Sequence, residues 1–389
     1  MNEARPDTVR EAVKVHAANV QAAKIRDARL DFFRGASLVI IFMAHLLGNP
    51  WNNWIPARWG LSDAADTFVF CSGFASGLAF YKVFGSHGAW IGAVRVGFRV
   101  WQVYWAHVGV TLAAAALAVA VAQGWDDGRL MAAFGLTGFV NRFDQNLLAL
   151  LTLQAQPGRS DILPMYLVML AAMPAAVMLG WVWRWLPLLV CLGLYLWANS
   201  TGANFTHSTG GWFFNPLAWQ LYFFVGFFIA SGMIPAPPRH WALTSFAIIF
   251  CLACFLISDV GMRYLGPEAR AWRQALVPPF PDFKTNLAIL RVTHFFCTAY
   301  LVGIAWKSLN DHLQGAWARP VVLMGQYALA IFMVGVLLSM AGTAIAGVWR
   351  GGWPMWIVLN LGGIAGLYLT AHVARAVKRL DRQAEPLPA

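Results

Sequence analysis

The sequence predicts an all-α integral membrane protein, a bundle of about ten transmembrane helices with both termini in the cytoplasm. Of its 389 residues, 59% are hydrophobic and only 12% are charged, about half the charged share of a soluble domain. The mean hydropathy is +0.58, and several apolar runs approach the roughly 20 residues that a helix needs to cross a bilayer. Aromatic residues reach 14%, which excludes a disordered chain.

Ten apolar stretches, separated by proline, glycine and charged residues, are the expected spans. They lie near 32–49, 64–84, 101–122, 162–181, 185–200, 216–233, 241–259, 287–306, 321–347 and 353–374. With the N-terminus inside, 17 of the 28 lysines and arginines fall on the inner side, nine on the outer side and two within spans. This bias predicts cytoplasmic termini. The expected division is a polar cytoplasmic tail at 1–28, a transmembrane domain at 29–375 and a basic cytoplasmic tail at 376–389.

Three expected outer loops differ from the short inner ones. The loop at 50–63 holds three tryptophans, which is typical of an aromatic belt at the membrane surface. The loops at 123–161 and 260–286 are long, polar and charged, and such loops often line a binding mouth. In a Gram-negative bacterium this outer side is the periplasm. No internal repeat is visible, which argues against a transporter built from inverted repeats.

The first span contains an arginine and a histidine at a suggestive spacing. Arg34 and His45 are eleven residues apart, about 16 Å along a helix, so Arg34 is expected at the cytoplasmic mouth and His45 near the middle of the membrane. Asp31 lies three residues before Arg34 and can pair with it on one face. Ionisable groups inside a span indicate function by default. The alternative for His45 is a core residue bonded to a carbonyl.

The second span opens with two carboxylates on one helical face, Asp63 and Asp66. Two carboxylates this close raise one pKa, which suits proton shuttling. The alternative is helix capping by the first of them, with the second in the first turn. Further along the same span, Gly73 and Gly77 predict close approach of a neighbouring helix.

The eighth span is entered by Lys284, Arg291 and His294, whose spacing of seven and three residues places them on a common sector. Counted from outside, His294 lies about as deep as His45 does from the other side. We therefore expect two histidines to converge near the centre of the bundle. A satisfied core residue is the alternative for His294.

Other polar residues have two interpretations each. Asp161, just before the fourth span, suits either N-capping or catalysis. Aromatic and amide side chains of one outer segment suit either a carbohydrate surface or an aromatic belt; they are Trp212, Asn215, Trp219 and Gln220. On the inner side, Arg95 and Arg99 lie four apart, where they suit phosphate binding or simply topology.

Several classes of function are excluded. The net charge of +11 comes from basic residues between spans, so no nucleic acid is expected. Seven further histidines show no metal-ligand spacing, and Cys251 and Cys254 form a C-x-x-C motif without a second pair; we interpret these cysteines as small buried hydrophobic residues. No phosphate-binding or dinucleotide-binding glycine motif is present. Neither a metal nor a bound cofactor is expected.

Seven blocks of sequence, in order between about residues 26 and 345, resemble the OpgC family, within the larger acyltransferase-3-like transmembrane group. They are RLDFFRG at 29–35, GNP after His45, GLSDAADTFVF at 60–70, QPGRSDILPMY at 156–166, GGWFFNPLAWQ at 210–220, KTNLAILRVTHF at 284–295 and MGQYALAIF at 324–332. Proteins of this family are taken to succinylate osmoregulated periplasmic glucans. The hallmark of the larger group is an arginine, ten residues and a histidine in the first span, which Arg34 and His45 match.

The resemblance implies roles for particular residues. It makes His45 the catalytic base and Arg34 a contact to the acyl donor. Asp66 stands where the family usually has glutamate, so the carboxylate is kept with a shorter reach. Further residues lie in family blocks without a role assigned by the resemblance: Asp63, Asp161, Asn215, Gln220, Lys284, Asn286, Arg291, His294 and Gln326.

The resulting hypothesis is an acyl-CoA-dependent O-acyltransferase, multi-pass in the bacterial inner membrane, that moves an acyl group, expected to be succinyl, onto a periplasmic glucan. The donor's phosphates would bind near Arg34, Arg95 and Arg99, with Asp31 beside them. His45 would act as general base or carry the acyl group, and Asp66 or His294 would orient it. The expected acceptor contacts are Asp63, Asp161, Trp212, Asn215, Trp219, Gln220, Lys284, Asn286, Arg291 and Gln326.

The expected partners are thus membrane lipid, acyl-CoA and the glucan acceptor, and the sequence does not decide the oligomeric state. One competing class is a proton-coupled carrier or flippase for a glycan or organic anion, which would use the same intramembrane groups as a relay. A scaffold for other glucan enzymes is a third interpretation.

Overall fold

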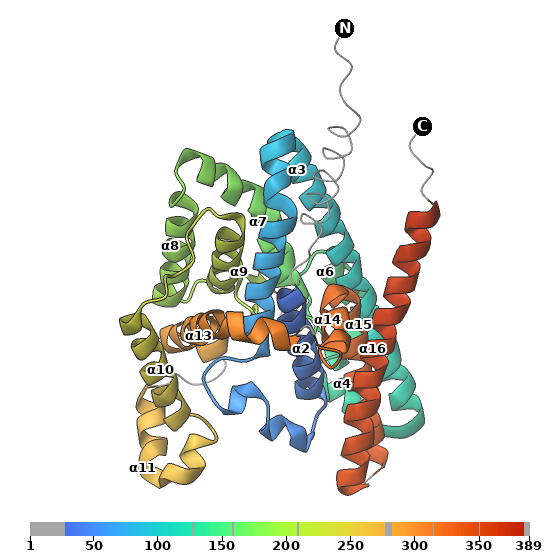
Figure 1. The fold of residues 1–389 in the computed structure, drawn as a ribbon. Coiled ribbons are helices and arrows are strands. Elements are labelled where there is room, and N and C mark those ends of the chain that lie inside the picture. Colours follow the sequence, from blue (N-terminus) through green and yellow to red (C-terminus); the bar gives the residue numbers. More distant parts are fainter. Residues whose placement is uncertain are drawn as a thin grey trace.

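The computed structural model describes residues 28–126, 128–157, 159–207, 210–276, 282–313, 315–349 and 351–384. The tail predicted at 1–28 lies outside this part except for its last residue. The fold is predominantly α-helical, as predicted (Figure 1). Between Ala28 and Leu151 the elements are α2 (Ala28–His45), η1 (Pro50–Asn53), η2 (Pro56–Arg58), α3 (Ala64–Val121), the π-helix η3 (Ala122–Asp126), α4 (Arg129–Ala133), α5 (Thr137–Asn141) and α6 (Phe143–Leu151).

The remaining elements are mostly apolar helices. They are α7 (Ile162–Val182), α8 (Leu186–Thr201), α9 (Pro216–Ser231), α10 (Trp241–Leu256), α11 (Gly261–Leu276), α12 (Asp282–Thr285), α13 (Ile289–Leu313), α14 (Arg319–Gln326), α15 (Ala328–Val348) and α16 (Gly352–Ala384). A two-stranded antiparallel hairpin, β1 (Thr206–His207) and β2 (Gly210–Gly211), precedes α9. Residues 376–384 of the predicted basic tail continue α16, and the rest of that tail lies outside the described residues.

Helix α3 contains two of the predicted spans. Its 58 residues would measure about 87 Å if straight, almost three times the hydrocarbon thickness of a bilayer. The helix is broken at Gly88, whose φ of 82° and ψ of 171° are not helical. Glycine has no Cβ and adopts this conformation without steric cost. In Figure 1 the two arms meet at the top of the view, and they carry the predicted spans 64–84 and 101–122.

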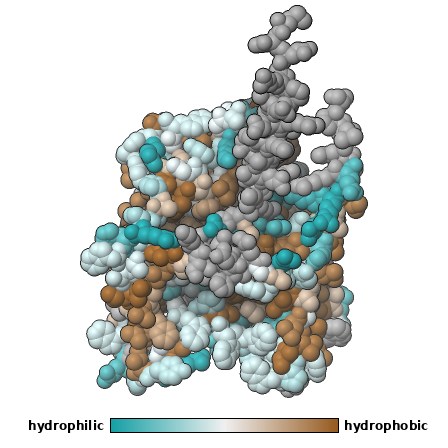
Figure 2. All heavy atoms as spheres, viewed as in Figure 1, coloured by the Kyte–Doolittle hydropathy of each residue, from teal (hydrophilic) through white to brown (hydrophobic). Residues whose placement is uncertain are grey.

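Four helices in the described ranges are long and apolar enough to cross a membrane: α3, α7, α15 and α16. Helices α10 and α11, bent by 68° at their junction, count as a fifth if they form one span. Shorter apolar helices lie at 186–201, 216–231 and 289–305. Large apolar side chains are exposed along α10 and α16, including Ile249 and Leu369, and Figure 2 shows apolar residues across this face of the molecule. Both features are those of a membrane protein.

Glycines allow the central helices to pack closely. A Cβ atom on Gly73 would lie 1.8 Å from the carbonyl oxygen of Phe223, and one on Gly77 would lie 2.6 Å from that of Phe227. Helix α9 therefore approaches the first arm of α3 backbone to backbone, which confirms the predicted close contact. Gly325 of α14 meets the backbone of α2 at Asp31 in the same way. These contacts hold α3 against α9 and α2 against α14, and the candidate site lies at the ends of α2 and α3.

Candidate active site

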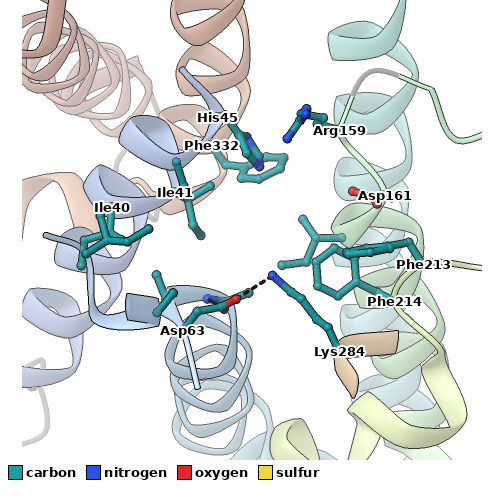
Figure 3. Close-up of a pocket in the computed structure, with 16 residues that line it drawn as sticks. Ile40, Ile41, His45, Asp63, Arg159, Asp161, Phe213, Phe214, Lys284 and Phe332 are labelled. Atoms are coloured by element: carbon teal, nitrogen blue, oxygen red, sulfur yellow. Dashed lines mark hydrogen bonds and ion pairs between the residues drawn. The ribbon is translucent and has the colours of Figure 1, made fainter. Parts of the chain in front are cut away.

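A cavity of about 530 Å³ lies where the C-terminal end of α2 meets the N-terminal ends of α3 and α7 (Figure 3). Pockets of this size accept small ligands. Each of the three unusual outer loops contributes to its wall, as expected of loops that line a binding mouth. The lining residues are Ile40, Ile41, Ala44, His45, Ile55, Ala57, Asp63, Ala64, Ala65, Arg159, Asp161, Ile162, Phe213, Phe214, Lys284 and Phe332.

His45 is the last residue of α2, and its imidazole faces the cavity beside the ring of Phe332 (Figure 3). Within the described part of the chain, no residue donates a hydrogen bond to its ring or accepts one from it. The alternative of a core histidine bonded to a carbonyl is therefore not what the structure shows. A neutral imidazole without an internal partner is able to take a proton from a bound hydroxyl.

Asp63 joins the cavity wall to the start of α3. Its side chain accepts a hydrogen bond from the backbone N–H of Ala65, and Asp66 accepts one from the backbone N–H of Asp63, which makes a capping box. Lys284 Nζ lies 2.7 Å from Asp63 Oδ2 and Arg291 Nη2 lies 3.0 Å from it. Burial opposes ionisation, but these two cations outweigh it and hold the pKa of Asp63 well below its usual range. The capping interpretation is confirmed, and Asp63 faces the cavity as well.

Asp66 lies behind this wall and is fully buried. Arg291 donates to both of its oxygens, from Nε at 3.0 Å and from Nη2 at 2.5 Å, and also donates to the carbonyl oxygen of Leu61 at 3.0 Å. With the capping bond to Asp63 N–H, both oxygens of Asp66 are occupied. The structure thus does not place Asp66 beside His45, where the sequence suggested it would act.

His294 is also outside the cavity lining. Its Nδ1 lies 2.8 Å from the hydroxyl oxygen of Ser62, and its ring packs against Gly60, where a Cβ atom would lie 2.5 Å from the imidazole. The predicted common sector of Lys284, Arg291 and His294 is confirmed, since all three contact the segment 60–66. The expected convergence of His294 with His45 is not seen, because His45 lines the cavity whereas His294 packs against Gly60 and Ser62 outside it.

Arg159 and Asp161 come from one short segment and both face the cavity (Figure 3). Asp161 is the N-cap residue of α7, and its side chain makes no hydrogen bond of the usual capping kind, although the backbone N–H groups at the start of the helix favour its ionised form. Burial raises the pKa of Asp161 to about 6, against the opposing charges of Lys284 and Arg159. Arg159 was not among the predicted site residues, although it stands two residues before Asp161 in the same sequence block.

Comparison with known proteins decides the family. Residues 26–379 match the family described as OpgC protein, which is nearly the whole chain. The chain belongs to the OpgC family. Comparisons with curated proteins and with solved structures found no match. Membership of the OpgC family indicates a role in the modification of osmoregulated periplasmic glucans and a transferase activity on them.

The predicted acceptor residues around α9 form a scaffold in this OpgC-family protein. Asn215 caps α9 through the N–H of Leu217 and donates to Asn286 Oδ1 at 2.8 Å. Trp219 donates to the carbonyl oxygen of Lys284 at 3.1 Å, while Gln220 donates to that of Cys191 at 2.7 Å. Trp212 is buried against Phe205. None of these five predicted residues lines the cavity; Asn215 and Trp219 instead hold the segment that carries Lys284.

The predicted donor residues lie apart from the cavity as well. Arg34 Nη1 lies 3.8 Å from Asp31 Oδ1, which confirms their pairing on one face of α2. Arg95 is exposed on α3, and Arg99 donates to Gln102 at 3.2 Å. Gln326 ends α14. In the described ranges, no group of three or more His, Cys, Asp or Glu side chains is arranged to hold a metal ion.

Proposed function

We propose that this OpgC-family protein is an O-acyltransferase of the bacterial inner membrane that moves an acyl group from cytoplasmic acyl-CoA to hydroxyl groups of a periplasmic glucan. Succinyl is the acyl group implied by the sequence resemblance. The observation that carries the proposal is the imidazole of His45, which faces a cavity of about 530 Å³ without a hydrogen-bond partner among the described residues. Charged side chains at the same cavity supply sites for polar substrates.

In the proposed reaction, His45 accepts the proton of a glucan hydroxyl. The hydroxyl oxygen forms a bond to the carbonyl carbon of the thioester, and the carbon–sulfur bond breaks. Coenzyme A leaves as a thiolate and takes the proton from the imidazolium of His45. The products are a glucan ester and the free thiol of coenzyme A, so atoms and charges balance.

Asp161 takes the role that the sequence suggested for Asp66. Of these two carboxylates, Asp161 lines the cavity together with His45, whereas Asp66 is occupied by Arg291. A carboxyl group with a pKa of about 6 exchanges protons readily near neutral pH. We therefore assign the stabilisation of the imidazolium that forms on His45 during transfer to the carboxylates of the cavity wall, Asp161 and Asp63.

The proposed topology has ten crossings and cytoplasmic termini. Every predicted span overlaps a helix of the structure, with α3 supplying two because of its break at Gly88. The excess of lysine and arginine on one side supports the orientation. In this arrangement the cavity opens toward the periplasm, and the donor reaches it from the side of Arg34, Arg95 and Arg99.

Mass spectrometry of periplasmic glucans tests the proposal directly. Four matched strains are compared: one without the gene, one with the wild type, one with His45→Ala, and one with His372→Ala as a control. His372 is an exposed histidine on α16 that contacts Tyr368. The proposal predicts an added acyl mass in the wild type and the control only, with all variants present in the membrane at equal abundance. Glucans of equal mass in all four strains would contradict it.

The competing carrier interpretation gives a different result in vitro. A transferase releases free thiol from acyl-CoA when glucan is added, because the carbon–sulfur bond is broken. A carrier leaves acyl-CoA intact under the same conditions. Thiol release by the purified protein in lipid therefore separates the two classes.

A further inference from the structure

We infer that Arg159 forms a carboxylate subsite within the cavity and selects acyl groups that end in a free carboxylate. The inference rests on the proposed acyl transfer, and it assigns a specificity role to a residue that neither sequence spacing nor the resemblance singled out. Its basis is the pairing of the charges at the cavity, the backbone at Arg159 and the direction of its guanidinium.

Several other cations around this end of the molecule, including the second cation of the cavity lining, already have acidic partners. Lys284 pairs with Asp63, and Arg291 pairs with Asp63 and Asp66. On the outer loop, Arg58 and Arg273 share Asp259. Arg159, in contrast, has no carboxylate within 4.0 Å among the residues that the structure describes. Asp161 shares the cavity wall with Arg159 and its carboxyl group feels the charge of the guanidinium, but the two form no ion pair, so Arg159 is able to bind a carboxylate that enters the cavity.

The backbone at Arg159 is held in a conformation that arginine rarely adopts. Its φ is 62°, in the left-handed region that is unfavourable for a non-glycine residue. Two neighbouring contacts fix it there. The guanidinium lies 5.5 Å from the centre of the Phe134 ring, and the hydroxyl group of the next residue, Ser160, lies 3.1 Å from that of Thr111. Packing thus imposes the position of Arg159, as is common at functional sites.

The direction of the side chain matches a dicarboxylic acyl group. Figure 3 shows the guanidinium of Arg159 directed into the cavity on the side of His45, and the lining of the cavity also includes apolar side chains such as Ile41 and Phe332. In the inferred complex the thioester carbonyl lies at His45, the two methylene groups lie against the apolar part of the lining, and the free carboxylate binds Arg159. Guanidinium and carboxylate form two parallel hydrogen bonds, which gives both strength and orientation.

This arrangement disfavours binding of a neutral acyl group that has the same length as succinyl. Butyryl has a methyl group where succinyl has its carboxylate, so it would leave Arg159 in the cavity without its anion. A site built to bind a polar group rejects the analogue that lacks it more strongly than an apolar pocket rejects an added group. The expected discrimination is at least about tenfold, the usual effect of one charge-assisted hydrogen bond.

The test is a competition between succinyl-CoA and butyryl-CoA, using purified full-length protein in lipid and glucan from cells that lack the gene. Mass spectrometry gives the ratio of succinyl to butyryl esters for wild type, Arg159→Gln and Arg159→Lys. Arg142→Gln, at an exposed position in a loop, is the matched control. The inference predicts that Arg159→Gln lowers the ratio at least about tenfold, that Arg159→Lys lowers it less, and that the control keeps the wild-type ratio.

Three outcomes overturn the inference. If Arg159→Gln changes neither the ratio nor the total amount of ester, the subsite is removed. If both products fall equally, so that only the total amount changes, Arg159 acts on the shared thioester or on coenzyme A. If Arg159→Gln does not fold, inhibition of the wild type decides: free succinate must compete with succinyl-CoA more strongly than butyrate does. Equal inhibition by the two acids also contradicts the subsite. Failure of the wild type to transfer either group is a different result, because it refutes the proposed function itself.

Discussion

Arg291 holds the carboxylate of Asp66 with two hydrogen bonds, from Nε at 3.0 Å and from Nη2 at 2.5 Å, across 225 residues of sequence. Both side chains are buried. The pair joins the first turn of α3 to α13, and through Lys284 and Asp63 it extends to the cavity wall. This relationship makes Asp66 a structural residue and leaves the chemistry to the groups that line the cavity.

Removing one partner of this pair should destabilise the protein strongly. Asp66→Ala leaves the buried guanidinium of Arg291 with fewer acceptors, and loss of one partner of a buried ion pair costs about 3–5 kcal/mol. The thermal unfolding midpoint in detergent measures the effect. In the double variant Asp66→Ala, Arg291→Met, no unpaired charge is created, so its midpoint should lie above that of Asp66→Ala. A double variant less stable than both single variants would contradict this account.

The contact between Gly60 and His294 predicts a suppressor pair. A Cβ atom at position 60 would lie 2.5 Å from the imidazole, so Gly60→Ala should displace His294, break its hydrogen bond with Ser62 and cost about 1–3 kcal/mol. In a His294→Ala background the same glycine substitution should cost almost nothing. Unfolding midpoints of the two single variants and the double variant check the coupling. Additive effects would show that the two residues do not interact.

Close packing of α3 against α9 makes Gly73 sensitive to added volume. Gly73→Val places atoms where the carbonyl of Phe223 lies, and the resulting separation of the helices should reduce the amount of folded protein in the membrane sharply. Gly97→Val on the same helix is the matched control, since nothing lies within 4 Å of its added Cβ. Size-exclusion profiles of the two variants measure the difference. Equal profiles would mean that the helices do not approach as described.

We expect Asp259 to make a pH-dependent contribution to the stability of the fold. It binds Arg58 and Arg273 and so connects the outer loop at 50–61 to the junction of α10 and α11. Burial favours the protonated form, but the hydrogen bonds from both arginines outweigh it and lower the pKa of Asp259 below its ordinary value of 3.8. A carboxyl group with a lowered folded-state pKa stabilises the fold above its unfolded pKa and loses this effect as the pH falls.

Asp259→Asn should therefore be less stable than the wild type at pH 7, and the difference should shrink below about pH 4. Unfolding midpoints across this pH range measure it. Glu268→Gln, at an exposed position on α11, is the control and should follow the wild type at every pH. A constant difference between Asp259→Asn and the wild type would show that the carboxylate's charge does not matter.

Much of the fold could be predicted because apolar runs of membrane length are a strong local signal. All ten expected spans overlap helices. One feature could not be predicted: the spans at 64–84 and 101–122 belong to one helical run that is broken at Gly88. The residues between the spans permit a helix, and the break depends on the backbone conformation of a single glycine. The stretch expected at 241–259 is helical only to Leu256, because Asp259 is bound by arginines from two other segments.

The site was predictable where local spacing decides the contact. The pairing of Asp31 with Arg34 and the cap formed by Asp63 and Asp66 depend on residues three apart. Which carboxylate shares the cavity with His45 depends on packing across the whole chain. Arg291 of α13 binds Asp66, and the segment before α7 brings Asp161 and Arg159 to the cavity. Neither contact could be predicted from spacing in the sequence.

Acceptor-dependent release of coenzyme A by purified protein tests the central claim most directly. Wild type and His45→Asn are compared in lipid with succinyl-CoA, with and without periplasmic glucan, after equal unfolding midpoints have been shown. The account predicts glucan-dependent thiol release by the wild type and a rate about 10²- to 10⁴-fold lower for His45→Asn, the usual contribution of a general base. Equal release by the two proteins would contradict the assignment of His45, and absence of release by the wild type would contradict the transferase.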